Sequence, residues 1–134
     1  MKLLLDTHII LWSLMNPEKL SEKALDLLQL DNIEIFYSTA SIWEVAIKHM
    51  AKPESMLISG SELADMCIQA GYSRLSINDC HVKALETISR PETAPRHNDP
   101  FDRMLIAQAK AENMSFVTHD SLIPYYDESC VISV

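Results

Sequence analysis

Short apolar runs alternate with longer segments of helical periodicity along this chain. The runs are rich in Leu, Ile, Val and aromatic residues and have the length of buried strands. Strands are therefore predicted over residues 2–5, 33–37, 74–77, 115–118 and 130–134. Between them, apolar residues recur three or four positions apart, which predicts helices over residues 7–14, 22–30, 61–70, 79–87 and 101–112 and one ending near residue 51.

Polar residues mark the starts of several of these helices. The candidate N-caps are Ser21, Asn78, Asp99 and one of Ser38, Thr39 and Ser41. Gly71 follows a predicted helix end, and residues 89–98, which contain two prolines and no periodicity, predict a surface loop.

Strands that alternate with helices are typical of right-handed crossovers and of a parallel sheet covered on both faces. We therefore predict an α/β fold. The 134 residues suit one compact domain over 1–134, because this length can bury a single hydrophobic core. The apolar fraction of 48% and the charged fraction of 22% exclude intrinsic disorder as the main state.

The chain is acidic, with a formal net charge of −8. This charge argues against capture of nucleic acid by the bare surface, because phosphate binding normally uses a surplus of Lys and Arg. It does not exclude nucleic acid as a substrate, since bound divalent cations reverse the local sign of an acidic cluster.

Cysteine usage and the N-terminus favour a soluble cytoplasmic protein. Cys67, Cys80 and Cys130 are an odd number without CxxC spacing, which favours reduced thiols that serve as small core residues. Asp6 and His8 interrupt the N-terminal apolar run, so it does not have the form of a signal peptide. No other run approaches the roughly 18 apolar residues needed to span a bilayer, and we expect no membrane association.

Four acidic residues lie at or near predicted strand-to-helix or strand-to-loop positions, and ligands and catalytic groups gather at the carboxyl ends of strands in open α/β sheets. They are Asp6, Glu44, Asp102 and Asp120. Carboxylates crowded together repel one another, and a bound cation relieves that repulsion. Carboxylate oxygens are preferred ligands of Mg²⁺ and Mn²⁺, and such an ion can activate a water for hydrolysis.

Three of these acids, and the neighbouring Asp99, also have an ordinary interpretation. Asp99 is a natural N-cap, and Asp102 then occupies the third helical position, where an acid favours the positive end of the helix dipole. Glu44 can pair with Lys48 four residues later, and Asp120 can begin a turn.

Histidine and aromatic residues near the acids add further candidates. Three histidines lie within two residues of a candidate acid and could shuttle protons or contact phosphate: His8, His97 and His119. Trp12, Trp43, Ile47 and the Met residues at helical spacing are expected in the core, and residues 125–126 are expected to cover it as a lid.

Four segments together resemble the PIN domain family. They are Leu3-Leu4-Leu5-Asp6-Thr7-His8, Ser41-Ile42-Trp43-Glu44-Val45-Ala46-Ile47-Lys48, His97-Asn98-Asp99-Pro100-Phe101-Asp102-Arg103 and Val117-Thr118-His119-Asp120. The order and spacing match over nearly the whole chain. The branch they resemble is that of the ribonuclease toxins of bacterial VapBC toxin–antitoxin modules.

The resemblance implies a three-layer α/β/α sandwich around a central, mainly parallel sheet of four or five short strands. It also implies metal-dependent cleavage of single-stranded or structured RNA, inhibition by a small antitoxin protein, and a homodimer. Position by position, the family's acidic quartet corresponds to Asp6, Glu44, Asp102 and Asp120, and Asp99 belongs to the His-x-Asp-Pro-Phe-Asp-Arg pattern.

Under this hypothesis Asp6 and Asp102 are the principal ligands of Mg²⁺ or Mn²⁺, and Glu44 and Asp120 complete the shell directly or through water. The accessory residues are Thr7 and Thr118, which orient carboxylates, Arg103 and Arg96, which hold the scissile phosphate, and His97.

Two other classes of protein stay open. A PIN-like binding module would keep the pocket and act through a partner, with little or no cleavage. A receiver-type or phosphoryl-transfer protein would also place an acid after its first strand. That design needs a further acid close to Asp6 and a Lys after a late strand, and neither is evident.

Overall fold

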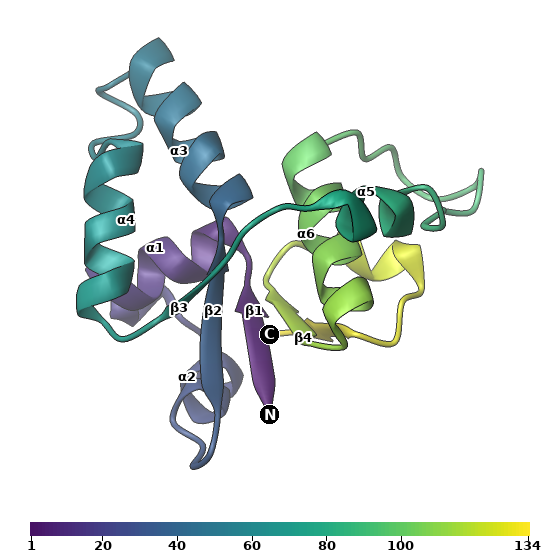
Figure 1. Cartoon of the computed structure of the whole chain (residues 1–134), viewed down its shortest axis with the longest axis horizontal. Helices are drawn as coiled ribbons and strands as arrows, with labels where there is room; N and C mark the ends of the chain where they lie inside the picture. Colours follow the sequence, from purple (N-terminus) through teal and green to yellow (C-terminus); the bar gives the residue numbers. More distant parts are fainter.

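A parallel sheet of five strands forms the centre of the protein (Figure 1). The structure, a computed structural model, describes residues 1–134. The strands are β1 (Lys2–Leu5), β2 (Glu34–Ser38), β3 (Ser73–Leu75), β4 (Ser115–Thr118) and β5 (Val131–Ser133). Their order across the sheet is β3-β2-β1-β4-β5, and every neighbouring pair is parallel. The predicted parallel sheet is confirmed, with small shifts in strand bounds.

Helices connect the strands. They are α1 (Thr7–Met15), α2 (Glu22–Leu28), α3 (Thr39–Ala51), α4 (Gly60–Gln69), α5 (Asp79–Leu85) and α6 (Pro100–Glu112), with the 3-10 helices η1 (Pro17–Lys19) and η2 (Ile123–Tyr126). The side chains of Ser21, Ser38, Asn78 and Asp99 accept backbone hydrogen bonds at the starts of α2, α3, α5 and α6. Helix α4 begins at Gly60 because Ser59 and Glu62 form a capping box. The length and apolar character needed to cross a membrane are not combined in any of these helices.

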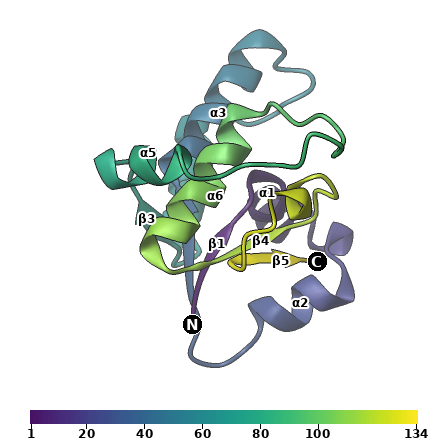
Figure 2. The ribbon, with the colours of Figure 1, turned by 90° about the vertical axis from the view of Figure 1, so that its right-hand side faces the viewer.

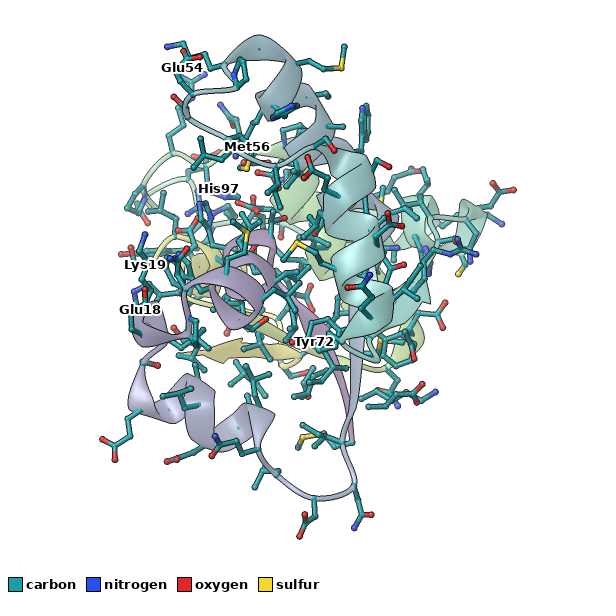
Figure 3. The ribbon with its side chains drawn as sticks, turned by 90° about the vertical axis from the view of Figure 1, so that its left-hand side faces the viewer. Glu18, Lys19, Glu54, Met56, Tyr72 and His97 are labelled. Carbon is teal, nitrogen blue, oxygen red and sulfur yellow. The ribbon has the colours of Figure 1, made fainter.

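The alternation of side chains along the strands builds one apolar core on each face of the sheet. Leu3, Leu5 and Val117 pack into a cluster that α1, α2 and α4 complete (Figure 3). Leu4 and Phe116 pack into the opposite cluster, which α6 and η2 complete. Figure 2 looks onto this face, where α6 covers the sheet. The expected three-layer α/β/α arrangement is therefore confirmed.

The order of the strands creates a topological switch point between β1 and β4. From β1 the chain builds outward through β2 and β3 on one side, and it later adds β4 and β5 on the other. Ligands of open α/β sheets bind at the carboxyl ends of the strands that flank such a point. Asp6 follows β1 at this place, and its backbone N–H donates to the carbonyl oxygen of Val117 at 2.9 Å.

Several predictions about buried side chains are wrong. Trp43, Ile47 and Met50 are 59%, 44% and 82% exposed, because α3 runs past the end of the sheet and its outer turns pack mainly against α4 (Figure 1). Cys80 is exposed as well, since the first turn of α5 directs the neighbouring His81 into the interior instead.

The contact between α3 and α4 requires a residue without a side chain at Gly60. A Cβ atom at this position would lie 2.9 Å from both the Cβ atom of Ala46 and the carbonyl oxygen of Ile42. The helices would have to separate to accept it, because neither atom belongs to a flexible side-chain end.

We expect Gly60→Ala to lower the free energy of unfolding by about 1 to 3 kcal/mol, as overpacking of a close contact does. Ser61→Ala, at the exposed next position of α4, is the matched control and should leave stability nearly unchanged. Urea unfolding followed by circular dichroism measures both. Equal midpoints for the two variants would contradict the close packing of α3 on α4.

Candidate functional site

A polar pocket of about 320 Å³ lies at the switch point, beside the carboxyl ends of β1 and β4. Segments that are far apart in the sequence contribute to it, and Trp12 is its only hydrophobic lining residue. The lining residues are Asp6, His8, Trp12, Glu44, Lys48, Asp99, Asp102, His119 and Asp120. The fold therefore brings all four acids of the predicted quartet into one pocket, together with Asp99.

Asp6 is buried at the end of β1 and holds two elements together. Its Oδ1 accepts a hydrogen bond from the backbone N–H of Thr7 at 2.7 Å, which caps α1, and its Oδ2 accepts one from Oγ1 of Thr118 at 2.6 Å. Burial raises the pKa of Asp6 to about 6, although these two hydrogen bonds oppose the rise. Asp6 thus has a structural role as a helix cap, which the sequence interpretation did not include.

Glu44 comes from the second turn of α3 and is almost fully buried. Its Oε1 accepts a hydrogen bond from Oγ1 of Thr7 at 2.7 Å, and its Oε2 pairs with Nζ of Lys48 at 2.6 Å. The predicted ion pair between i and i+4 therefore exists, but Glu44 also faces the pocket. Thr7 and Thr118 each hold one carboxylate of the pocket, as expected for orienting residues.

Asp102 carries the most strongly raised pKa among the acids of the pocket. Burial raises the pKa of Asp102 to about 8, and the charges of Asp6, Asp99, Glu44 and Asp120 add to the effect. Asp99 lies beside it as the N-cap of α6, where Oδ1 accepts from the N–H groups of Phe101 at 2.9 Å and Asp102 at 3.2 Å. The capping interpretation of Asp99 is confirmed, and the side chain still lines the pocket.

Asp120 lies two residues beyond β4. Its Oδ1 accepts a hydrogen bond from the N–H of Leu122 at 2.8 Å, so it does begin a turn as its ordinary interpretation required. Its Oδ2 is 4.0 Å from Nε2 of His97, and the same nitrogen is 3.1 Å from Oδ2 of Asp102. Ligand atoms of His97, Asp102 and Asp120 thus lie within 4.8 Å of one another.

The basic side chain that lines the pocket is Lys48, which is half exposed. Burial lowers the pKa of Lys48, but the hydrogen bond and charge of Glu44 and the charges of Asp99 and Asp102 outweigh it and leave the pKa raised. Neither Arg96 nor Arg103, the expected phosphate contacts, lines the pocket. The sequence indicated a place for Lys48 near the pocket only through its spacing of four residues from Glu44, which predicts an ion pair between the two.

The donor set of the pocket fits a hard divalent cation. Its acids offer carboxylate oxygens, which Mg²⁺ and Mn²⁺ prefer over nitrogen or sulfur. Burial is the main cause of the raised pKa values of Asp6 and Asp102, and the negative charge of neighbouring acids adds to it. A cation bound among these oxygens would favour their ionised forms.

Cys80, His81 and Glu112 form a second cluster of possible metal ligands, but the imidazole of His81 already has protein partners. The Nδ1 of His81 accepts from the backbone N–H of Asn78 at 3.1 Å, so the ring carries its proton on Nε2, 2.8 Å from Oε1 of Glu112. Both ring nitrogens therefore have partners, and the cluster works as an anchor between α5 and α6.

Comparison with known proteins places the chain in a family. A model of the PIN domain matches residues 3–128, and the chain belongs to the PIN domain family. No curated protein sequence matches it significantly.

Two solved structures share the fold at low sequence identity. One is VapBC2 from Rickettsia felis bound to a DNA fragment from their promoter, with 16% identity, a TM-score of 0.68, and coverage of 100% of this chain and 98% of the other. The other is FitAcB from Neisseria gonorrhoeae, with 19% identity, a TM-score of 0.64, and coverage of 98% and 96%. The similarity to both extends over the whole α/β/α arrangement.

The raised pKa of Asp102 makes the metal-free protein less stable as pH rises. This carboxyl ionises at 3.8 ordinarily and at about 8 in the folded protein. Between these values the folded state binds more protons than the unfolded chain, so the free energy of unfolding falls with increasing pH. Asp102→Asn removes this titration. The free energy of unfolding of the variant minus that of the unmodified protein is therefore expected to increase from about pH 5 to about pH 8.5, by an amount on the order of a few kcal/mol.

Urea unfolding in the presence of a chelator at the two pH values measures this gain. Asp65→Asn, at an exposed position of α4, is the control and should follow the unmodified protein. If the difference in free energy of unfolding between Asp102→Asn and the unmodified protein is the same at both pH values, the raised pKa of Asp102 is contradicted.

Proposed function

We propose that this protein is a metal-dependent endoribonuclease that hydrolyses phosphodiester bonds of single-stranded or structured RNA. We also propose that it is the toxin of a toxin–antitoxin pair. The observation that carries the proposal is the convergence of Asp6, Glu44, Asp102 and Asp120 on one pocket of a PIN domain. PIN domains are generally nucleases, and hydrolysis of a phosphodiester commonly uses a cation held by such acids.

Asp6 and Asp102 are the principal candidates to hold Mg²⁺ or Mn²⁺, because they are the buried acids whose pKa values are raised. Glu44 and Asp120 complete the shell directly or through water. A divalent cation bound there supplies a Lewis acid that activates water and offsets charge on the phosphate.

The protein's own side chains prepare the pocket for this chemistry. Thr118 and Thr7 fix the carboxylates of Asp6 and Glu44, so the acids do not need to reorganise. Lys48, half exposed at the pocket, is positioned to meet the phosphate backbone. With a net charge of −8, RNA binding in this proposal depends on the cation and on Lys48 rather than on a basic surface.

Purified protein is expected to cleave RNA in the presence of Mg²⁺ or Mn²⁺ and to stop when a chelator is added. Asp6→Asn should reduce cleavage by at least about 100-fold, because it removes a charged ligand, while circular dichroism shows a folded protein. Asp26→Asn, exposed on α2, is the control and should cleave normally. Full activity of Asp6→Asn would refute the assignment of the site.

Calorimetry with Mn²⁺ separates the nuclease from a PIN-like binding module. A nuclease binds the cation and turns over some member of a diverse RNA pool. Binding of Mn²⁺ without turnover of any RNA in the pool would favour the module instead.

An apolar groove beside the acidic pocket supports the proposed antitoxin partner. The groove has a volume of about 280 Å³ and shares His8 and Trp12 with the pocket. Figure 3 looks onto this face, with Met56 and Lys19 labelled near α1. Leu57 lines the groove and is 74% exposed. A partner segment with apolar side chains for the groove and a basic side chain for the pocket would complement both.

The predicted homodimer stays a prediction. The exposed stripe of Trp43, Ile47 and Met50 on α3, the helix after β2, offers one apolar surface for it.

The product of a short reading frame adjacent to the gene is expected to co-purify with this chain and to block cleavage. Leu57→Asp should weaken the complex about tenfold or more, because it places a charge in the apolar groove. Leu30→Asp, at a similarly exposed position beyond α2, is the control. Binding measured by calorimetry that is equal for both variants would exclude the groove as the docking site.

A further inference from the structure

The hydroxyl group of Tyr126 lies inside the protein, between His97 and Arg103. Tyr126 ends η2 and is 3% exposed. Its oxygen lies 2.7 Å from Nδ1 of His97, and Nη1 of Arg103 donates to it over 3.4 Å. Buried tyrosine hydroxyls commonly have such partners, and here one partner leads to the acidic pocket.

His97 connects this hydroxyl group to the acids. Its Nε2 is 3.1 Å from Oδ2 of Asp102 and 4.0 Å from Oδ2 of Asp120. The imidazole is itself buried, so its ring nitrogens interact with these protein groups rather than with bulk water. It therefore spans the distance between Tyr126 and two acids of the quartet.

Arg103 gives the hydrogen bonds a direction. A guanidinium group can only donate, so it offers no acceptor for the buried Tyr126 O–H. Nδ1 of His97, 2.7 Å away, is the acceptor within hydrogen-bond distance, so the Tyr126 O–H is assigned as its donor. A neutral imidazole that accepts at Nδ1 carries its proton on Nε2, which then donates to Oδ2 of Asp102. Bonds arranged in such a chain polarise and strengthen one another.

The ring of Tyr126 is held from several sides. The guanidinium groups of Arg90 and Arg103 lie 5.0 and 5.6 Å from its centre, and the ring of His97 meets it edge-on at 5.5 Å. Arg90 also donates to the carbonyl oxygens of Leu122, at 3.1 Å, and Pro95. These contacts connect the loop before α6 to η2.

We propose that Tyr126 is a positioning residue of the acidic pocket, which acts through His97 by fixing the imidazole with its Nε2–H on Asp102. The proposal rests on the proposed metal-dependent function, because its effect is on the ligand Asp102. With Oδ2 held by His97, Oδ1 has no hydrogen-bond partner in the protein and is available to a cation. Removing the hydroxyl group frees the imidazole and lets Asp102 change its orientation.

Tyr126→Phe tests this role, because it keeps the ring and its contacts and removes only the hydroxyl group. We expect its dissociation constant for Mn²⁺, measured by calorimetry on the full chain, to rise about 10- to 100-fold, as loss of an outer-shell partner does. Tyr125→Phe is the matched control: its ring also lies near Arg90, at 5.5 Å, but its hydroxyl group has no partner. Unchanged Mn²⁺ affinity in Tyr126→Phe would overturn the proposal.

A double-mutant cycle shows whether Tyr126 acts through His97. If it does, Tyr126→Phe adds nothing to the loss of Mn²⁺ affinity already caused by His97→Ala. Independent, additive losses would mean that Tyr126 supports the pocket by another route and would overturn the proposed role.

Nitrogen NMR of His97 provides a readout that does not depend on a metal or on activity. The unmodified protein should show the Nε2–H form with a hydrogen-bonded Nδ1, as the contacts of both ring nitrogens indicate. Tyr126→Phe should shift the Nδ1 signal to that of an acceptor without a donor, and Tyr125→Phe should not. An Nδ1–H form in the unmodified protein would exclude the proposed direction.

These measurements separate the two proposals. If the NMR and Mn²⁺ results are as expected but no RNA is cleaved, the proposed ribonuclease function fails and the positioning role stands. If the unmodified protein cleaves RNA while Tyr126→Phe alters neither Mn²⁺ binding nor the His97 signals, the positioning role alone fails.

Discussion

Two hydrogen bonds to Asp6 join three elements at the centre of the sheet. Asp6 follows the end of β1, Thr7 is the first residue of α1, and Thr118 is the last residue of β4. The carboxylate of Asp6 accepts hydrogen bonds from the N–H of Thr7 and the hydroxyl group of Thr118. These bonds offset part of the free-energy cost of burying a carboxylate and keep it at the switch point. The remaining acids of the pocket approach this junction from α3, from α6 and from the turn after β4.

The same acids serve the fold and the pocket. Asp6 caps α1 and Asp99 caps α6, while Asp102 occupies the first turn of α6. Two helix N-termini therefore direct their positive ends toward the cluster, which partly compensates its negative charge. Capping and metal binding are consequently compatible interpretations of one residue rather than alternatives, because a carboxylate has lone pairs for both.

Local signals made most of the fold predictable. The caps Ser21 and Asn78 act on N–H groups within the next three residues, and apolar runs reveal strands whose ends a parallel sheet must bring together. Side-chain contacts between segments that are distant in the sequence could not be predicted from local patterns. The exposure of Trp43 depends on how far α3 projects beyond the sheet, and the hydrogen bond between His97 and Tyr126 joins residues separated by 29 positions. Neither spacing nor composition reports such distances.

The buried state of Asp102 ties any cation in the pocket to the acidity of the medium. With a pKa of about 8, this carboxyl holds a proton in neutral solution. If the oxygens of Asp102 held a cation, that proton would have to be released, so cation binding would be linked to proton release. The apparent affinity for the cation would then rise with pH, and the measured heat of binding would depend on the ionisation enthalpy of the buffer that takes up the proton.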